Sequence, residues 1–275
     1  MTEKNKSIFA FDLGYSLWRN RDLIWQMTRR EVVGRYRGSV FGLAWSFFYP
    51  LLMLAVFTFV FGVVFKARWG VGIEQTNLEF ALILFVGMTM FNLFSECAAR
   101  APTLITGNVS YVKKVVFPLE ILPAVTLGSA LFHWLVSFFV LTLAMLLIKG
   151  SIPLTAFFMP LIVLPLAVAS MAMVWLLSSL GVFLRDVGQT IGIVLTVLQF
   201  LSPVFYPISA LPPEYQAWLL FNPLTFVIEQ SRAVFIWGQY PDWGGLLVYW
   251  VACCMLALFG YWWFQKTRKG FADVL

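Results

Sequence analysis

Residues 29–50, RREVVGRYRGSVFGLAWSFFYP, place a dense positive charge directly against a long aromatic segment. Four arginines fall within the nine positions 29–37, and no charged residue follows them until Lys66. A helix needs about 20 mostly apolar residues to cross the hydrocarbon core of a bilayer, and the segment after Gly38 is longer than that. Lys and Arg beside such a segment are typical of the cytoplasmic border of a membrane. The stretch therefore predicts a membrane-spanning helix with a cationic border.

The composition of the whole chain of 275 residues supports this interpretation. Hydrophobic residues make up 61%, charged residues only 12%, and the mean hydropathy is +0.84. Soluble proteins are nearer ~45–50% apolar and ~25% charged, so much of this surface must face lipid. Inside lipid, only helices and closed barrels satisfy every backbone hydrogen-bonding group. Because the apolar runs are long and do not alternate as barrel strands do, we predict an all-α integral membrane protein.

Six apolar runs are long enough to span the membrane, and we expect a single domain over residues 1–275. The predicted spans are residues 41–65, 78–99, 121–148, 153–184, 187–208 and 243–264. A further apolar stretch, residues 215–228, is fourteen residues long and is interrupted by Asn222-Pro223. Because it is too short to cross, it predicts a re-entrant hairpin between the fifth and sixth spans.

The basic residues predict the orientation of these spans. An even number of spans puts both termini on one side, and fifteen of the nineteen Lys and Arg residues then lie on that side. By the positive-inside rule, both termini are cytoplasmic. The formal net charge of +6 is attributed to contact with anionic membrane lipid, and no nucleic acid partner is expected. The first apolar run begins at residue 41 and is longer than the core of a signal peptide, so no cleavable signal is expected.

Residues 15–37 show the pattern of an amphipathic helix that lies in the membrane interface. The apolar side is formed by Leu17, Ile24 and Met27, with Trp18, Trp25 and Val32 adjacent to them. The polar side carries Arg19, Asp22, Arg29 and Arg30. The pattern is imperfect, because Arg21 and Glu31 interrupt the apolar side.

The residues that usually perform chemistry are scarce. The sequence contains no GxxxxGK[ST], GxGxxG, GxSxG or HExxH motif. The three cysteines have neither disulfide nor metal-site spacing, so they are interpreted as small packing residues and no metal site is predicted. His133 lies alone in the third span, where a histidine more often hydrogen-bonds a neighbouring helix than acts in catalysis. Glu96 and Arg100 are one helical turn apart and are expected to pair.

Aromatic residues make up 18% of the chain, and two groups of them lie in predicted spans. They are Phe41, Trp45, Phe48 and Tyr49 in the first span, and Phe200, Phe205 and Tyr206 at the end of the fifth. Aromatic rings offer flat apolar faces, and Tyr and Trp add a polar group, which suits the apolar faces and hydroxylated rims of sugar rings. The alternative is that Trp and Tyr mark the membrane interface and that Phe faces lipid.

Several short motifs occur along the chain in the order RREVVGRYRGSVFGLAWSFFYPLL, GNVSYVKKVVFPLEILP, FLRDVG, SPVFYP, LPP and FNPLT. Together they resemble the membrane subunit of polysaccharide ABC exporters of the type-2 permease class, and within it the O-antigen exporter permeases. The resemblance runs from about residue 20 to the C-terminus. Exporters of this class move O-antigen, capsule or teichoic-acid chains.

The resemblance implies an assembly of several chains. Two copies of the permease form a pore at their interface, and two copies of a separate ATPase chain, which binds ATP and Mg²⁺, drive transport; no cofactor is expected on the permease. The interface helix and the loop of residues 104–116 would contact the ATPase. The contact residues in that loop would be Asn108, Tyr111, Lys113 and Lys114. This chain has Leu119 where relatives often carry a basic residue, which puts a charge network at that position in doubt.

The resemblance also implies how the polymer is handled. The polymer arrives on a polyprenyl pyrophosphate lipid in the bacterial inner membrane, the aromatic residues of the first and fifth spans line its path, and residues 210–232 form an outer gate. Planar guanidinium groups bind phosphate oxygens in pairs. We therefore expect the pyrophosphate to dock on Arg29, Arg30, Arg35 and Arg37. The alternative is that these arginines only anchor the topology.

Two other functions stay open at this point. The first is a type-2 permease for a small drug or lipid, against which the short outer loops and the aromatic groups argue. The second is an integral-membrane enzyme that modifies glycans, such as an acyltransferase. That enzyme would need a reactive polar cluster, and the sequence offers only His133 for it.

Overall fold

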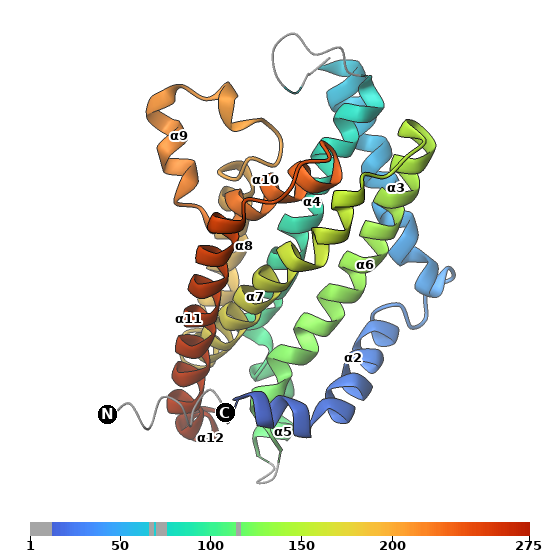
Figure 1. The fold of residues 1–275 in the computed structure, drawn as a ribbon. Helices are drawn as coiled ribbons and strands as arrows, with labels where there is room; N and C mark the ends of the chain where they lie inside the picture. Colours follow the sequence, from blue (N-terminus) through green and yellow to red (C-terminus); the bar gives the residue numbers. More distant parts are fainter. Residues whose placement is uncertain (1–12, 66–68, 70–75, 114–116) are drawn as a thin grey trace.

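The computed structural model describes residues 13–65, 69, 76–113 and 117–275, and every regular element within these ranges is helical. The long helices form a bundle (Figure 1). Residues 13–19, α5 (Val109–Val112) and α12 (Phe271–Val274) lie at one end of this bundle, which we call the terminal end. α9 (Pro213–Leu220) lies toward the opposite end. The prediction of an all-helical chain is confirmed for the described residues.

Five helical segments of the described chain are long and apolar enough to cross a membrane. They are Gly42–Val64, Asn77–Thr103, Leu119–Lys149, Leu154–Phe183 and Trp243–Val274, and each overlaps a predicted span. The α-helices within them are α3 (Trp45–Phe57), α4 (Asn77–Arg100), α6 (Leu122–Lys149), α7 (Met159–Phe183) and α11 (Trp243–Thr267). In the first segment, α3 continues as a π-helix over Thr58–Val64.

The fifth predicted span, residues 187–208, is only partly helical. α8 (Val187–Phe200) has 14 residues. At 1.5 Å per residue it is about 21 Å long, against the ~30 Å of a hydrocarbon core. Pro203 and Pro207 follow it, and a proline lacks the backbone N–H of a continuing helix and disfavours helical geometry in the residue before it. The prediction of a continuous helix over residues 187–208 is therefore wrong for residues 201–207, although the apolar pattern continues there.

α4 is the central helix of the bundle. It contacts α3, α6, α7, α8 and α10 (Pro223–Phe235), and every residue from Phe80 to Gly87 is buried. A capping box begins the helix: Thr76 Oγ1 accepts a hydrogen bond from the N–H of Glu79 (3.2 Å), and Glu79 Oε2 accepts one from the N–H of Thr76 (2.9 Å). Side chains on α4 can therefore bind to several other elements at once.

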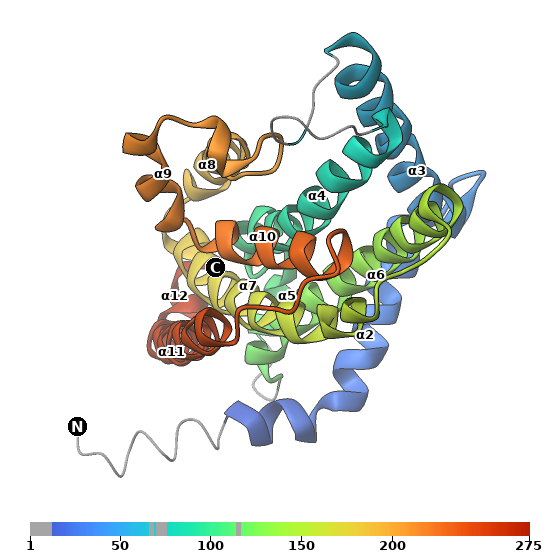
Figure 2. The ribbon, with the colours of Figure 1, turned by 45° about the horizontal axis from the view of Figure 1, so that its top comes forward.

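The predicted interface helix of residues 15–37 consists of two helical segments. Asn20 separates residues 13–19 from α2 (Arg21–Arg35), and the chain bends there (Figure 2). α2 packs on α6 and buries Met27, Thr28 and Val32. Trp18 and Trp25 are 70% and 69% exposed, so the face that packs on the bundle is narrower than the apolar side read from the sequence.

α9 and α10 meet at Asn222-Pro223, where the sequence predicted a break. Asn222 Oδ1 accepts a hydrogen bond from the N–H of Leu224 (2.9 Å), and Pro223 lies in the first turn, where no N–H is needed. The Nδ2 group of Asn222 donates to the carbonyl of Leu201 (3.3 Å) and to Ser202 Oγ (2.8 Å). The two short helices are thereby joined to the end of α8.

Candidate functional site

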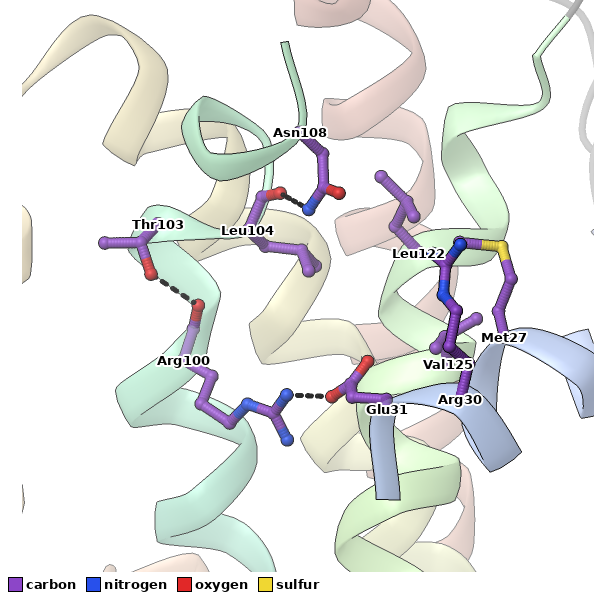
Figure 3. A pocket seen from close by; sticks show the side chains of 9 residues that line it. All are labelled: Met27, Arg30, Glu31, Arg100, Thr103, Leu104, Asn108, Leu122 and Val125. Atoms are coloured by element: carbon purple, nitrogen blue, oxygen red, sulfur yellow. Dashed lines mark hydrogen bonds and ion pairs between the residues drawn. The ribbon is translucent and has the colours of Figure 1, made fainter. Parts of the chain in front are cut away.

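A pocket of about 340 Å³ lies at the terminal end of the bundle, between α2, the end of α4 and the start of α6 (Figure 3). Its lining is Met27, Leu104, Leu122, Val125, Thr103 and Asn108, with the charged Arg30, Glu31 and Arg100. Beside it, Arg30 Nη2 donates to the hydroxyl of Tyr111 (2.9 Å). The interface helix and the loop of residues 104–116, both predicted to contact an ATPase, therefore contact each other.

Glu31 interrupts the apolar side of α2 in the sequence. The structure shows that it is the partner of a basic residue on another helix. Its carboxylate forms an ion pair with Arg100 at the end of α4 (Figure 3). Arg100 also donates to Ser129 Oγ on α6 (3.3 Å) and lies 3.6 Å from Glu96, one turn earlier in α4. The predicted Glu96–Arg100 pair is present, but Arg100 binds Glu31 more closely. Because Arg100 compensates its negative charge, Glu31 can lie on the side of α2 that packs against the bundle.

Glu96 is the centre of a second polar cluster. Its Oε1 lies 2.5 Å from Arg35 Nη1 and 2.9 Å from His133 Nδ1, and the hydroxyl of Tyr36 lies 3.1 Å from His133 Nε2. A proton on Nδ1 lets His133 donate to Glu96 and accept from Tyr36. Burial raises the pKa of the Tyr36 hydroxyl, which keeps its proton available for this bond. The prediction that His133 hydrogen-bonds a neighbouring helix is confirmed.

The four arginines of the predicted pyrophosphate site differ in what they contact. Arg30 is bonded to Tyr111, and Arg35 contacts Glu96 and His133. Arg29 and Arg37 are exposed, and their side chains form neither a hydrogen bond nor an ion pair with the described residues. Of the four, only Arg29 and Arg37 keep the whole guanidinium group available to a ligand.

The loop residues predicted to contact an ATPase are also of two kinds. Asn108 Nδ2 donates to the carbonyl of Leu104 (2.8 Å), and the ring of Tyr111 stacks on Phe117 with 4.3 Å between centroids. These two side chains stabilise the shape of the loop. Lys113 is exposed, and Lys114 lies outside the described residues.

The aromatic residues predicted in the first span form one cluster. The rings of Phe41 and Trp45, and of Phe41 and Phe48, have centroids 5.6 Å apart, and those of Trp45 and Phe48 are 6.3 Å apart. All three side chains are about half exposed, as is Tyr49 beside them. This cluster leaves an aromatic surface uncovered at the start of α3.

The aromatic residues predicted in the fifth span, at the end of α8 and just after it, lie at the other end of the first span. The ring of Phe205 is 5.7 Å from that of Phe61 and 6.4 Å from that of Phe57, and Phe200 lies 5.7 Å from Phe205. The hydroxyl of Tyr206 donates to the carbonyl of Phe200 (2.8 Å). The two predicted groups therefore occupy opposite ends of Gly42–Val64.

The surroundings of Arg232 were not predicted from the sequence. The predicted orientation makes it one of the four Lys and Arg residues on the side of the membrane away from the termini, and the structure adds that its side chain is completely buried. It donates to the backbone carbonyls of Ile83, Pro203 and Val204 and to the carboxylate of Glu229. The one local signal was the spacing of Glu229 and Arg232, three residues apart on a helix, which is typical of an ion pair. No sequence pattern indicates the hydrogen bonds from Arg232 to the distant backbone carbonyls.

A packing role was predicted for all three cysteines. The burial of Cys97 and Cys253 agrees with it, whereas Cys254 is exposed. Within the described ranges, no three His, Cys, Asp or Glu side chains come together in a way that could hold a metal ion.

The fold and these contacts define a multi-span helical membrane protein in which polar residues join a surface helix to the spans. A profile of the ABC-2 type transporter family matches residues 22–236, and the chain belongs to that family.

Named relatives narrow the class further. The chain is 26% identical to the O-antigen export system permease protein RfbA of Myxococcus xanthus, over 94% of this chain and 96% of the relative. It is 24% identical to the polysialic acid transport protein KpsM of Escherichia coli, over 78% and 81%. It is also 24% identical to the capsule polysaccharide export inner-membrane protein CtrC of Neisseria meningitidis serogroup B, over 96% and 98%. The resemblance read from the ordered motifs is confirmed.

Proposed function

We propose that this chain is the channel-forming permease subunit of an ATP-driven exporter that moves lipid-linked, O-antigen-like polysaccharide across the inner membrane of a bacterium. The observation that carries the proposal is the similarity, over nearly the whole chain, to a permease named for O-antigen export. Two other relatives are named for polysialic acid transport and for capsule polysaccharide export. Because all three names concern large carbohydrates, polysaccharide is favoured over a small solute.

The proposed exporter contains a second copy of this chain and two ATPase chains. ATP and Mg²⁺ bind to the ATPase chains in this proposal, and the permease holds no cofactor. The second copy is supported by α8, whose exposed residues include Gln189, Thr190 and Thr196, because polar side chains are costly against lipid tails. The ATPase is supported by the surface at the terminal end, where α2 and the loop of residues 104–116 are joined and Lys113 is exposed.

The proposed topology places the terminal end in the cytoplasm, with both termini there. The remaining crossing, at residues 187–208, is made by α8 together with the residues that follow it, of which 201–207 are not helical. The segment of residues 13–19 and α2 lies at the level of the lipid headgroups, where the exposed Trp18 and Trp25 suit a membrane interface. The pair of helices α9 and α10 enters the membrane from the outer side as a re-entrant gate, over residues 210–232.

The polymer path in this proposal runs between the two copies along the aromatic side chains. The cluster of Phe41, Trp45 and Phe48 marks its cytoplasmic end, and Phe200, Phe205 and Tyr206 mark its outer end. Many weak and equivalent stacking contacts let a sugar chain slide without being trapped. The pyrophosphate of the lipid carrier docks on Arg29 and Arg37, which have no partner among the described side chains.

The alternatives have less support. A permease for a small drug or lipid would belong to the same family, but none of the three relatives above is named for such a substrate. A glycan-modifying enzyme would depend on His133, whose two ring nitrogens contact Glu96 and Tyr36. If a His133→Ala variant lost the modification of a glycan while export continued, the enzyme would have to be reconsidered.

The test of the proposed function is deletion of the gene in its host, followed by analysis of the cell surface and of the purified chain. We expect surface polysaccharide to disappear, lipid-linked polymer to accumulate inside the cell, and an ATPase chain to co-purify with the tagged permease at one-to-one stoichiometry. Intact surface polysaccharide in the deletion strain would contradict the proposal that this chain exports polysaccharide. If the chain repeatedly purified alone in mild detergent, the proposed assembly with ATPase chains would be contradicted.

A further inference from the structure

Arg232 holds a charge inside the packed bundle, between elements that are far apart in the sequence. Its side chain is 0% exposed. Nε donates to the carbonyl of Ile83 (3.1 Å), Nη1 to the carbonyl of Pro203 (2.6 Å) and to Glu229 Oε1 (2.7 Å), and Nη2 to the carbonyl of Val204 (2.8 Å). A buried guanidinium is tolerated when it is hydrogen-bonded and its charge is paired; here each of its three nitrogens donates at least one hydrogen bond, and Glu229 supplies the opposite charge.

These bonds join α10 of the proposed gate, and the segment that follows α8, to α4. Pro203 and Val204 lie in a non-helical stretch, so their carbonyls do not accept from a helix N–H, and Pro203 and Pro207 supply no N–H of their own. Ile83 is a residue of α4. A single side chain on α10 therefore provides the donors that hold the end of α8 against the central helix.

The space around the guanidinium is filled on both sides. A Cβ atom added to Gly87 of α4 would lie 2.6 Å from Arg232 Nη2, so the close approach requires a glycine at this position. On another side, the guanidinium carbon lies 4.2 Å from the centroid of the Trp69 ring, a cation–π contact with the segment between the first two spans. Packed atoms therefore lie on both sides of the group.

The other end of α4 is held by the interface helix α2. Glu96 and Arg100 of α4 pair with Arg35 and Glu31. Thirteen residues separate Ile83 from Glu96, which is about 20 Å of α-helix at 1.5 Å per residue. α4 thus contacts the surface proposed for the ATPase at one end and Arg232 at the other.

We propose that Arg232 is a positioning residue that keeps the outer gate closed by holding α10 and the end of α8 on α4, and that movement of α4 breaks these contacts during export. This inference rests on the proposed function. In the closed state, the four hydrogen bonds of Arg232 fix the hairpin of α9 and α10. When the ATPase chains shift α2, the ion pairs of Glu31 and Arg35 displace α4, and the carbonyl of Ile83 moves away from the guanidinium.

The test measures passive leak through the purified permease in liposomes loaded with carboxyfluorescein, without ATP. Arg232→Lys keeps the charge but cannot reproduce the planar set of donors. We expect roughly tenfold faster release of the dye than with the unmodified chain, because the loss of a charged hydrogen bond shifts an equilibrium by about that factor. In complexes with the ATPase, the variant should hydrolyse more ATP for each polymer exported.

A second variant leaves Arg232 in place. Gly87→Ala puts a methyl group against Arg232 Nη2 and should also increase the leak. Gly244→Ala is the matched control and should not increase it, because its added Cβ lies at an ordinary distance of 3.5 Å from its nearest neighbour. Glu229→Gln removes the charge that pairs with the guanidinium but keeps an oxygen that can accept from Nη1, so it should give a smaller leak than Arg232→Lys. Size-exclusion chromatography and thermal unfolding identify folded protein, and Gly87→Ala decides the test if Arg232→Lys does not accumulate.

The outcomes are distinct. A leak in Arg232→Lys or Gly87→Ala, with an unchanged elution volume and an increased ratio of ATP to exported polymer, supports the gate role. Sealed liposomes and an unchanged ratio of ATP to exported polymer in these variants overturn the gate role. An equal loss of export and ATPase activity without a leak also overturns it, because that result is expected of a purely structural residue. The leak is measured on the permease alone, so failure to find an ATPase or a polysaccharide would contradict the proposed function without affecting this readout.

Discussion

At the residue scale, the charged side chains that the structure buries have partners far away in the sequence. Glu120 accepts hydrogen bonds from Ser16 (3.1 Å) and from Arg268 (2.7 Å), which joins the N-terminal segment and the C-terminal segment to the start of α6. Arg232 donates to carbonyls of α4 and of the segment after α8. A buried charge without a partner costs several kcal/mol, so each of these residues depends on the fold being complete.

The first prediction concerns Glu96. A Glu96→Gln variant keeps the size of the side chain but removes the charge that Arg35 and His133 share. We expect the free energy of unfolding to fall by about 1 kcal/mol, because both partners lose a charged acceptor but the half-exposed Arg35 side chain can be solvated by water instead. The measurement is unfolding in mixed detergent and denaturant. Glu214→Gln, at an exposed position of α9, is the control and should leave the free energy unchanged.

The second prediction concerns Arg29 and Arg37, whose side chains have no bonding partner among the described residues, unlike those of Arg30 and Arg35. Replacing Arg29 and Arg37 together by Lys keeps the charge that orients the protein but removes planar, bidentate binding of phosphate. We expect export of lipid-linked polymer to fall by roughly tenfold for each lost bidentate contact, with co-purification of the ATPase unaffected. Export at the normal rate would show that these arginines only anchor the topology.

At the element scale, the position of α2 depends on one close approach to α6. A Cβ atom added to Gly128 would lie 2.8 Å from Thr28 Oγ1 and 2.9 Å from Thr28 Cγ2. Thr28 is buried in this contact. Small residues allow such approaches between helices in membranes, and here the approach brings Glu31 within reach of Arg100.

The third prediction follows from that approach. Gly128→Ala should push α2 away from α6 and destabilise the protein by about 1–3 kcal/mol, the usual cost of overpacking. Adding Thr28→Ala removes the clashing atoms and should recover most of the loss, which a double-mutant cycle measures as non-additivity. Gly34→Ala, on α2 with nothing within 4 Å of its added Cβ, is the matched control. Additive losses in the cycle would contradict the proposed contact.

At the scale of the whole molecule, two helices have large exposed faces of different chemistry. The exposed residues of α11 over 247–259 are apolar, including Leu247, Val251 and Met255, as expected for contact with lipid. The exposed side of α8 mixes Val194 and Val197 with the polar Gln189 and Thr196. Because polar groups avoid lipid tails, α8 is the helix expected to face a second copy or the polymer.

The fourth prediction tests that difference with two similar positions. Val197 on α8 and Val251 on α11 are 51% and 53% exposed. In a chain without its native cysteines, Val197→Cys should form a disulfide between two copies in native membranes, and Val251→Cys should not. Non-reducing electrophoresis gives the result. A dimer formed through position 251 instead would place the interface on α11.

Much of this architecture is predictable from the sequence because it depends on local properties. Five of the six spans follow from the length of uninterrupted apolar runs, and the break between α9 and α10 follows from Asn222-Pro223. The pairing of Glu96 with Arg100 follows from helical spacing. The candidate site is less predictable: Asn108 and Arg30 line one pocket, but nothing in their sequence context indicates that they meet.

The sequence by itself determined the membrane class, the approximate spans and, through the order of its motifs, the transporter family. Only the tertiary structure decided where α8 ends, which arginines near the first span keep free guanidinium groups, and that Arg232 is buried. The physical reason is the range of the forces. Hydrophobicity and turn propensity act over one helix, whereas the bond from Arg232 to Ile83 joins positions 149 residues apart and exists only when the helices between them have packed.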